Sequence, residues 1–571
     1  MKKIFAIFLS IVLLVSVAVT VTACNDNDVV TDSLVVYNWA DYIYDTKLND
    51  FKDYYKALTG NNIEITYVTF DTNETMLTKL MQGDAQVDVI CPSEYAIQKL
   101  LENDMLVSLN YFDEQKYRSG MNVNSELYVH NSENIDRHII EKIDEGFSDI
   151  KVKGNDVPQK MSDYLVPYMY GTLGILYNKY AFNEMGIYDY ETMNNANWGI
   201  LFNDDGSGNK LSDGLTGNIL MKDSIRDSYA ATVFYLKESG KLNGLKTADG
   251  KLYTDMLAGE LINAVDDTLI ELCKTALTNQ KSELFGYEVD FGKDDLLKGN
   301  AMVDLAWSGD AMYAVEESWN DYLCPECVTR TGIEQGSGKD AVIVCSECGS
   351  ECGDYELGYY VPHSTGNIWF DGWVVPKNYD KGHLNAIKLF INFLNNPQVA
   401  AQNMLEIGYS SAVSADAVRS DDNARAILAE AYVVNDDSWE CVDEKGNAIT
   451  EFDYDSWEEF AEYYFDYCDE MDNSNWRYPF MIAESGDGTY NRNLETLGVM
   501  RDYGENNKAV VTMWNYARSA GVSALPLLGW TALAVAVVVG IVFLCEYIKH
   551  HKNSVVKVTN ATKSDESDKT E

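Results

Sequence analysis

The amino-acid sequence predicts an α/β protein built on a parallel sheet. Short apolar runs typical of buried strands alternate with segments whose apolar residues recur at helical spacing. Strands that alternate with helices form parallel sheets. The chain has 571 residues, of which 46% are hydrophobic and 23% are charged. It is therefore long enough for several packed domains, and its composition excludes a disordered chain.

Each element follows from its local pattern. The first helix places Phe51 and Tyr55 on one face and stops at Gly60, a residue type that often follows a helix. Strands are expected at residues 34–37, 63–68, 87–90, 302–306 and 372–375, and helices at 48–58 and 75–81. Ligands of parallel sheets lie beyond the carboxyl ends of the strands. The residues that follow each strand are therefore the first candidates for a site.

Acidic residues outnumber basic residues by two to one. The 90 Asp and Glu residues against 44 Lys and Arg residues give a formal net charge of −46. This charge repels phosphate backbones and argues against nucleic acid as a partner. It suits a cationic partner attracted over long range, although a merely solubilised surface would have the same composition.

The N-terminus has the features of an export signal. Two lysines precede an apolar run from Ile4 to Val19, and Val21-Thr22-Ala23-Cys24 follows. These last four residues resemble a lipobox, in which Cys24 takes a lipid and becomes the new N-terminus. The alternative is an ordinary cleaved signal with an incidental cysteine.

A second apolar stretch lies near the C-terminus. Residues 524–545 carry no charge and are numerous enough to span a bilayer. Lys549 and Lys552 follow, and basic residues flank the cytoplasmic end of a span. We therefore expect the body of the protein outside the cytoplasm and the tail inside. The alternative is a buried core helix.

Aromatic and acidic residues gather at the predicted strand ends. The segments are Asn38-Trp39-Ala40-Asp41-Tyr42, Cys91-Pro92-Ser93-Glu94-Tyr95, Trp307-Ser308-Gly309-Asp310 and Ile368-Trp369-Phe370-Asp371. One aromatic beside a strand is usually part of the core, but four such segments indicate a common site. Carboxylates attract ammonium groups, and aromatic faces hold cations and the methylenes between them. A slot of this kind fits a flexible aliphatic polycation.

At these residues the sequence resembles the spermidine/putrescine-binding proteins of bacterial ABC transporters, an extracellular solute-binding family. The matching blocks follow the family's order and cover about a third of the chain. They are Tyr37-Asn38-Trp39-Ala40-Asp41-Tyr42, Asn73-Glu74-Thr75-Met76, Pro92-Ser93-Glu94-Tyr95, Val166-Pro167-Tyr168, Asp223-Ser224-Ile225-Arg226-Asp227, Trp307-Ser308-Gly309-Asp310, Trp369-Phe370-Asp371, Ile391-Asn392-Phe393-Leu394 and Ile407-Gly408-Tyr409.

The resemblance implies a two-lobed, type II periplasmic-binding-protein-like fold that closes about a hinge on its ligand. It also implies roles for single residues. An aromatic box would consist of Trp39, Tyr42, Tyr95, Trp307 and Trp369. Asp41, Asp310 and Asp371 would pair with ammonium groups, and Ser93 would hydrogen-bond an amine. Asp227 matches a position that is often acidic, Ser224 stands where some members have a second acid, and Tyr409 would lie near the mouth.

Two departures from the family's pattern affect the expected ligand and the domain plan. Ser224 in place of an acid favours a diamine over a longer amine, and the chain exceeds the usual family length. The expected domains are a lipoprotein signal peptide at 1–23, a tether at 24–33, lobe 1 at 34–168 with an insertion at about 112–162, lobe 2 at 169–368 with a Cys-rich insertion at about 320–365, a return to lobe 1 at 369–415, completion of lobe 2 with a further insertion at 416–519, a transmembrane helix at 523–545 and a cytoplasmic tail at 546–571.

The Cys-rich insertion has a metal-binding pattern of its own. Cys324-Pro325-Glu326-Cys327 and Cys345-Ser346-Glu347-Cys348 are two Cys-x₂-Cys pairs, a spacing typical of a four-thiolate zinc ribbon. Such a ribbon needs few residues because the metal replaces a core. Disulfides are the alternative, since the domain is expected outside the cell. Either role is structural.

Sequence motifs of common enzyme classes are missing. There is no Gly-x-Ser-x-Gly, Walker or His-Glu-x-x-His motif. We therefore expect a non-enzymatic, membrane-anchored polyamine receptor that delivers its ligand to a separate permease and needs no cofactor beyond a structural zinc. The alternatives are a membrane-anchored solute sensor with the same fold and a binding protein for a different small cation.

Overall fold

The computed structural model describes residues 31–83, 85–188, 193, 195–318, 365–432 and 497–519, with short segments between 322 and 362. Residues up to Val511 form one compact unit and those from Thr512 belong to another. None of the helices within these ranges is both long and apolar enough to cross a bilayer. The expected signal peptide with Cys24 and the expected transmembrane helix lie outside the described residues.

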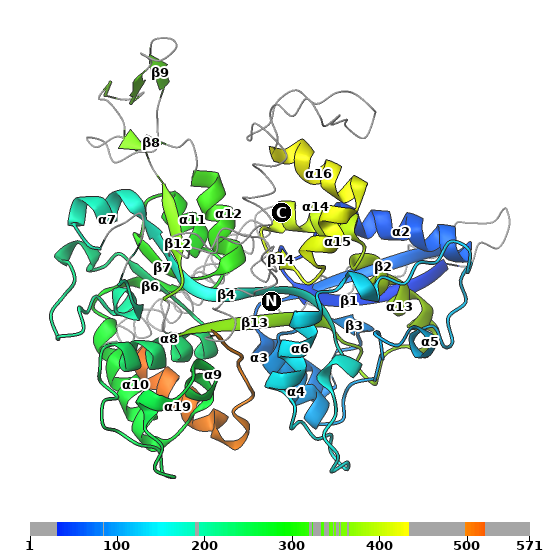
Figure 1. The fold of residues 1–571 in the computed structure, drawn as a ribbon, viewed down its shortest axis with the longest axis horizontal. Coiled ribbons are helices and arrows are strands. Elements are labelled where there is room, and N and C mark those ends of the chain that lie inside the picture. The colour runs from blue at the N-terminus through cyan, green and yellow to red at the C-terminus, as the bar shows by residue number, and fades with distance from the viewer. Residues whose placement is uncertain are drawn as a thin grey trace, which may run out of the picture. The chain divides into compact units, whose positions relative to one another are not determined.

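The first lobe contains a parallel sheet of three strands (Figure 1). Its order is β2-β1-β3, formed by β1 (Thr31–Trp39), β2 (Asn62–Phe70) and β3 (Val89–Ile90). The connecting helices are α2 (Thr46–Thr59) and α3 (Asn73–Gln82), and α4 (Glu94–Glu102) follows β3. α2 ends where Gly60 takes a φ of 78°, a conformation that costs glycine little. The predicted alternation of strands and helices is confirmed here.

Later segments complete the first lobe. They are α5 (Glu114–Tyr117), α6 (Arg137–Gly146), α13 (Leu384–Leu394), α14 (Pro397–Ile407), α15 (Ala415–Ser420) and α16 (Asp422–Tyr432). α15 and α16 pack on α14, which packs on α13. Residues 416–432 therefore lie with the first lobe, whereas the sequence analysis placed them in the second. α15 and α16 contact α14. Local periodicity does not reveal which element a helix packs against.

The second sheet is mixed rather than parallel. β4 (Val166–Asn178) is its centre, and the other strands are β5 (Ile219–Lys222), β6 (Leu284–Glu288), β7 (Val303–Trp307), β12 (Leu357–Tyr360), β13 (Gly366–Trp373), β14 (Ser410–Ser411) and β15 (Leu497–Gly498). β4 pairs with β7, β12, β13 and β14 in antiparallel fashion, while β5 pairs with β6 and β7 in parallel. All thirteen residues of β4 are buried.

The helices α7 (Lys179–Met185), α8 (Ile225–Glu238), α9 (Ala258–Asn263), α10 (Asp267–Gln280), α11 (Gly292–Leu297) and α12 (Ser308–Ser318) accompany this sheet, and α19 (Asn507–Ser519) ends the described chain (Figure 1). Two short antiparallel pairs lie in the Cys-rich insertion. They are β8 (Tyr322–Leu323) with β11 (Gly353–Asp354) and β9 (Ile333–Gln335) with β10 (Val342–Val344).

β13 links the second sheet to the first lobe. Beyond its pairing with β4, it bridges to Ser93 through Asp371, and Val374 just after it bridges to Ile90. The strand was expected at 372–375 but begins at Gly366. Trp369 and Asp371 therefore lie within the strand and not before it. Their place is set by pairing along β4, which joins residues far apart in sequence.

Candidate functional site

Three aromatic rings from three segments meet at the junction of the lobes. The Tyr409 ring centroid lies 5.1 Å from that of Tyr42 and 5.6 Å from that of Trp369, both in edge-on geometry. Two glycines leave room for them. A Cβ atom at Gly309 would lie 2.3 Å from the Tyr409 ring, and one at Gly171 would lie 2.5 Å from the Trp369 ring. The structure thus brings together three of the aromatic residues predicted from the sequence.

Asp371 is the carboxylate beside these rings. It is 5% exposed, and its Oδ1 atom is buried and makes no hydrogen bond of normal geometry. Burial raises the pKa of Asp371 to about 7, an effect that the adjacent hydroxyl groups of Ser93 and Tyr42 partly offset. The Nε1 atom of Trp369 and the hydroxyl of Tyr42 are also buried without such a bond. Buried polar groups normally have partners, so this cluster is suited to a polar ligand.

Glu94 is a second buried carboxylate, and the sequence analysis did not name it as a site residue. It is 1% exposed, and one of its oxygens accepts a hydrogen bond from the Phe370 backbone N–H at 3.0 Å. Burial raises its pKa to about 8, and the nearby Asp371 adds to the shift. Its position directly after Ser93 in a matching block was the available signal. The sequence does not show where the Glu94 side chain points.

Ser93 and Tyr95 are positioned by Asn73. The Asn73 Nδ2 group donates to the Ser93 hydroxyl at 3.0 Å and to the Tyr95 hydroxyl at 3.0 Å, while the Asn73 Oδ1 accepts from the Ser93 backbone at 3.2 Å. The Tyr95 hydroxyl donates to Glu74 at 3.3 Å. The Tyr95 ring faces Arg226, whose guanidinium carbon lies 4.2 Å from the ring centroid. Tyr95 therefore holds a protein cation in this structure.

Asp227 lies in the first turn of α8. It is buried, and burial is the main cause that raises its pKa, with Ser224 and Lys222 acting in the opposite direction. Its charge raises the pKa of Asp371, so the two carboxylates are close. The Ser224 hydroxyl accepts from the Asp227 backbone N–H at 3.4 Å and caps α8. Ser224 thus has a local structural role.

Trp307 and Asp310 are two predicted residues that the second lobe contributes. Trp307 ends β7 and lies against the Asp227 carboxylate. Asp310 is in the first turn of α12 and close to Tyr409. Both are accompanied by lysines that the sequence analysis did not name: Lys222 over the Trp307 ring and Lys293 at Asp310.

Trp39 and Asp41 are less enclosed than the others. The Trp39 ring packs on Phe70 with centroids 4.5 Å apart, and its Nε1 atom is buried without a hydrogen bond. Asp41 is exposed, with a φ of 46°, a left-handed conformation that Asp adopts more readily than most residues. The Asp41 carboxylate is near enough to raise the pKa of Lys293. It therefore contributes charge at the edge of the site rather than a buried contact.

The residues 497–503 connect both lobes beside this site. β15 pairs with β13, and Asp502 forms ion pairs with Lys99 of α4 at 3.0 Å and with Arg226 of α8 at 3.7 Å. Tyr503 stacks on Arg226 with the guanidinium carbon 3.8 Å from the ring centroid. No sequence pattern predicts this connection, because Lys99 and Arg226 are hundreds of residues away from Asp502 in the chain.

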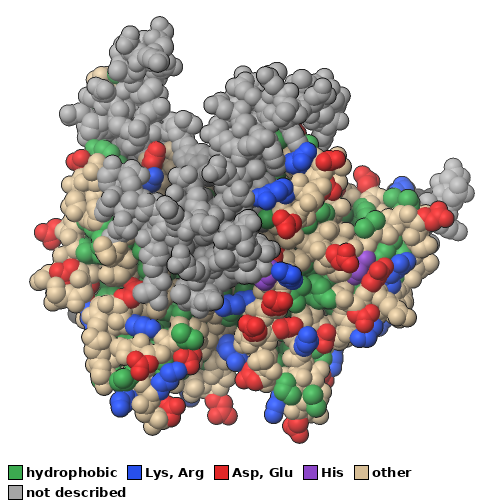
Figure 2. All heavy atoms as spheres, in the orientation of Figure 1, with side chains coloured by type: hydrophobic (Ala, Val, Ile, Leu, Met, Phe, Trp, Pro, Cys, Tyr) green, Lys and Arg blue, Asp and Glu red, His purple; other side chains and the backbone are tan. Residues whose placement is uncertain are grey.

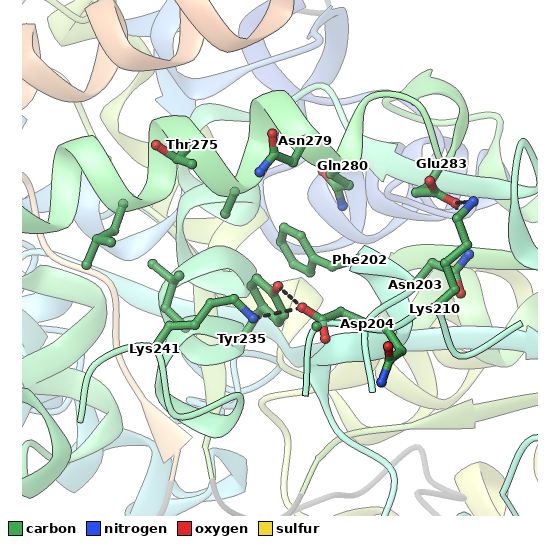
Figure 3. Close-up of a pocket in the computed structure, with 15 residues that line it drawn as sticks. Phe202, Asn203, Asp204, Lys210, Tyr235, Lys241, Thr275, Asn279, Gln280 and Glu283 are labelled. Carbon is green, nitrogen blue, oxygen red and sulfur yellow. Dashed lines mark hydrogen bonds and ion pairs between the residues drawn. The ribbon is translucent and has the colours of Figure 1, made fainter. Parts of the chain in front are cut away.

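A separate pocket of about 300 Å³ lies in the second lobe (Figure 3). Its charged groups are paired with one another, as the Asp204 carboxylate binds Lys241 at 2.7 Å and Glu283 binds Lys210 at 2.9 Å. It shares no lining residue with the aromatic site. Because these charged groups are already paired, we assign the pocket no ligand.

The predicted zinc ribbon is only partly described. Cys324 and Cys327 lie outside the described residues, while Cys345 is buried and Cys348 is exposed. The described residues contain no group of three or more His, Cys, Asp or Glu side chains that could hold a metal ion. The ribbon therefore stays a prediction.

The fold and this site define a two-lobed solute-binding protein. The family model described as bacterial extracellular solute-binding protein matches residues 50–431, and the chain belongs to that family. The putrescine-binding periplasmic protein SpuD of Pseudomonas aeruginosa is 23% identical over 406 residues, which cover 70% of this chain and 83% of that protein. The spermidine/putrescine-binding periplasmic protein of Escherichia coli is 21% identical over 429 residues, which cover 74% and 90%.

Among solved structures, the substrate-binding protein of a spermidine/putrescine ABC transporter from Streptococcus pneumoniae aligns with a TM-score of 0.46. It is 20% identical, and the alignment covers 85% of this chain and 99% of that one. The resemblance drawn from the matching blocks is confirmed by the family and by the names of the relatives. The family is one of solute-binding transport proteins.

Proposed function

We propose that this protein is the substrate-binding component of an ABC importer for aliphatic polyamines. One observation carries the proposal. The buried Asp371 carboxylate, with an oxygen that lacks a hydrogen bond, lies beside the rings of Tyr42, Trp369 and Tyr409. A carboxylate held by burial against aromatic faces is complementary to an alkyl ammonium group.

The electrostatics favour a cation over an anion. Asp371, Asp227 and Glu94 are all buried, and burial raises the pKa of each. An arriving ammonium would favour the ionised form of these carboxylates. On the face in Figure 2, acidic and basic side chains are interspersed over the described surface. The described part of this face therefore shows no segregated acidic patch.

Calorimetric titration of the purified protein with putrescine, cadaverine, spermidine and spermine tests this function. We expect at least one amine to bind with a dissociation constant of about 1 μM or tighter, which corresponds to about 8 kcal/mol. Folding would be verified by circular dichroism. A folded protein that binds none of the four amines would contradict the function and favour a sensor or a different small cation.

The mode of delivery follows from the sequence. We propose that lipid on Cys24 and a span at 523–545 hold the binding domain outside the membrane, where closure of the lobes passes the amine to a separate permease. The short tail at 546–571 would then lie in the cytoplasm. The extracellular family of the chain supports the placement of its body.

We also propose that the Cys-rich insertion holds one structural zinc. Support comes from Gly349, which has a φ of 75° and donates its N–H to the Cys345 carbonyl at 2.9 Å, a tight turn just after the second Cys pair. Elemental analysis after mild purification should find about one zinc per chain. Replacing Cys324 and Cys327 with serine should abolish that zinc. A metal-free protein with oxidised cysteines would establish the disulfide alternative instead.

A further inference from the structure

Two lysines occupy the Asp310 end of the site, where the sequence led us to expect only acids and aromatic residues. The Lys293 Nζ atom lies 2.9 Å from Asp310 Oδ1. The Lys222 Nζ atom lies 4.3 Å from the centroid of the Trp307 ring. A protein ammonium thus already stands at the carboxylate and at the aromatic face that a ligand ammonium would use.

Lys222 is a fixed part of the structure. Its side chain is 2% exposed, it pairs with Glu288 at 2.5 Å and it donates to the Val289 carbonyl at 2.9 Å. Burial disfavours its charge, but the Glu288 and Asp304 carboxylates outweigh that effect and raise its pKa. Removing one member of such a buried pair is strongly destabilising. Its ammonium group therefore stays over Trp307 whether or not a ligand is bound.

Lys293 is held more loosely but is hard to displace. Its side chain is 25% exposed and that of Asp310 is 11% exposed. Asp41 and Asp310 both favour its charge. A ligand ammonium that replaced it would exchange one N⁺–O⁻ contact for another. Because Lys293 is tethered, its effective concentration at Asp310 is on the order of millimolar or more, above that of a scarce solute.

Two further carboxylates of the site have no lysine or arginine of the described chain paired with them, although the Lys222 charge is near enough to act on Asp227. Among the described residues, neither Asp371 nor Asp227 belongs to an ion pair, although both are buried. These two carboxylates are therefore the positions left for ligand ammonium groups. The site offers one anchor fewer than its acidic residues indicate.

We propose that Lys293 is a specificity residue which neutralises Asp310, so that the site selects a short diamine and rejects longer polyamines that need Asp310 as a third anchor. The inference rests on the proposed function and assigns Asp310 to Lys293 rather than to the ligand. Specificity here arises from an occupied subsite, since a longer amine must either displace a tethered cation or leave one ammonium group unpaired.

The test compares putrescine and spermidine binding by calorimetry in the full-length protein and in Lys293→Met. We expect the wild type to prefer putrescine. In the variant, spermidine should bind about tenfold tighter or more, while putrescine changes by less than about threefold. Lys298→Met is the matched control, because Lys298 follows the same helix, is 63% exposed and loses the same charge. It should leave the ratio of the two affinities unchanged.

A double variant separates the freed carboxylate from a general charge effect. In Lys293→Met with Asp310→Asn, the gain for spermidine should disappear, because the anchor that was released is removed again. Thermal unfolding followed by circular dichroism verifies folding, and Lys293→Gln replaces the methionine variant if that variant unfolds.

Each remaining outcome is decisive. A wild type that prefers spermidine, or a Lys293 variant that changes the ratio no more than Lys298→Met does, would overturn the role of Lys293 while amine binding stands. Failure of the wild type to bind any amine would overturn the proposed function and this inference with it.

Discussion

Replacing Asp371 with asparagine is expected to weaken amine binding by about 2 kcal/mol or more, which is about thirtyfold. The side chain keeps its size, but the ligand ammonium loses its buried charge partner. One oxygen of that carboxylate, Oδ1, is buried and makes no hydrogen bond with the surrounding residues. Calorimetric titration with the best amine measures the loss.

The ligand-free Asp371→Asn protein should be at least as stable as the wild type at pH 8. Burial raises the pKa of Asp371 to about 7, so its ionised form destabilises the fold, and asparagine removes that cost. Asp53→Asn, on an exposed position of α2, is the charge-matched control and should not change binding. Unchanged affinity in Asp371→Asn, or loss of binding through unfolding, would refute the role assigned to this residue.

Amine affinity is expected to fall as the pH is lowered from 8 to 6. The pKa of Asp371 is about 7 and that of Glu94 about 8 in the ligand-free protein, in both cases chiefly because of burial. A cation binds the ionised carboxylate, so it must release the proton that occupies the site at lower pH. One group with a pKa near 7 predicts about a tenfold loss between pH 8 and pH 6, and coupling to Glu94 increases it.

Calorimetry in two buffers with different ionisation enthalpies would measure the protons released on binding. The amine itself stays charged over this range, because alkyl ammonium groups titrate near pH 10. Glu94→Gln should leave a dependence centred near pH 7, which isolates Asp371. A flat profile between pH 6 and pH 8, with no proton release, would show that neither carboxylate changes its ionisation when the ligand binds.

The sign is opposite for the stability of the ligand-free protein. A carboxylate whose folded-state pKa is raised above its unfolded value destabilises the fold increasingly as pH rises through that interval. Ligand binding and folding stability are therefore coupled at Asp371. The amine should raise the melting temperature more at pH 8 than at pH 6.

The sequence alone determined the parts that depend on local pattern. β1, β2, α2 and α3 were predicted from apolar periodicity, and Gly60 ends α2 as expected. The family resemblance of their motifs also indicated that Tyr42 and Trp369 share one site with Tyr409 near its mouth, although it did not reveal that Trp369 lies inside β13. Both the apolar periodicity and the family motifs can be recognised within short segments of the sequence.

Only the tertiary structure decided which charges face each other. It placed Lys293 at Asp310, directed Glu94 to the backbone of Phe370 and put Asp371 inside β13. The physical reason is that burial and ion pairing depend on which segments lie together in space. A lysine in the sequence has the same charge everywhere, but only its neighbours decide whether it is a solvated surface group or an internal substitute for a ligand's ammonium.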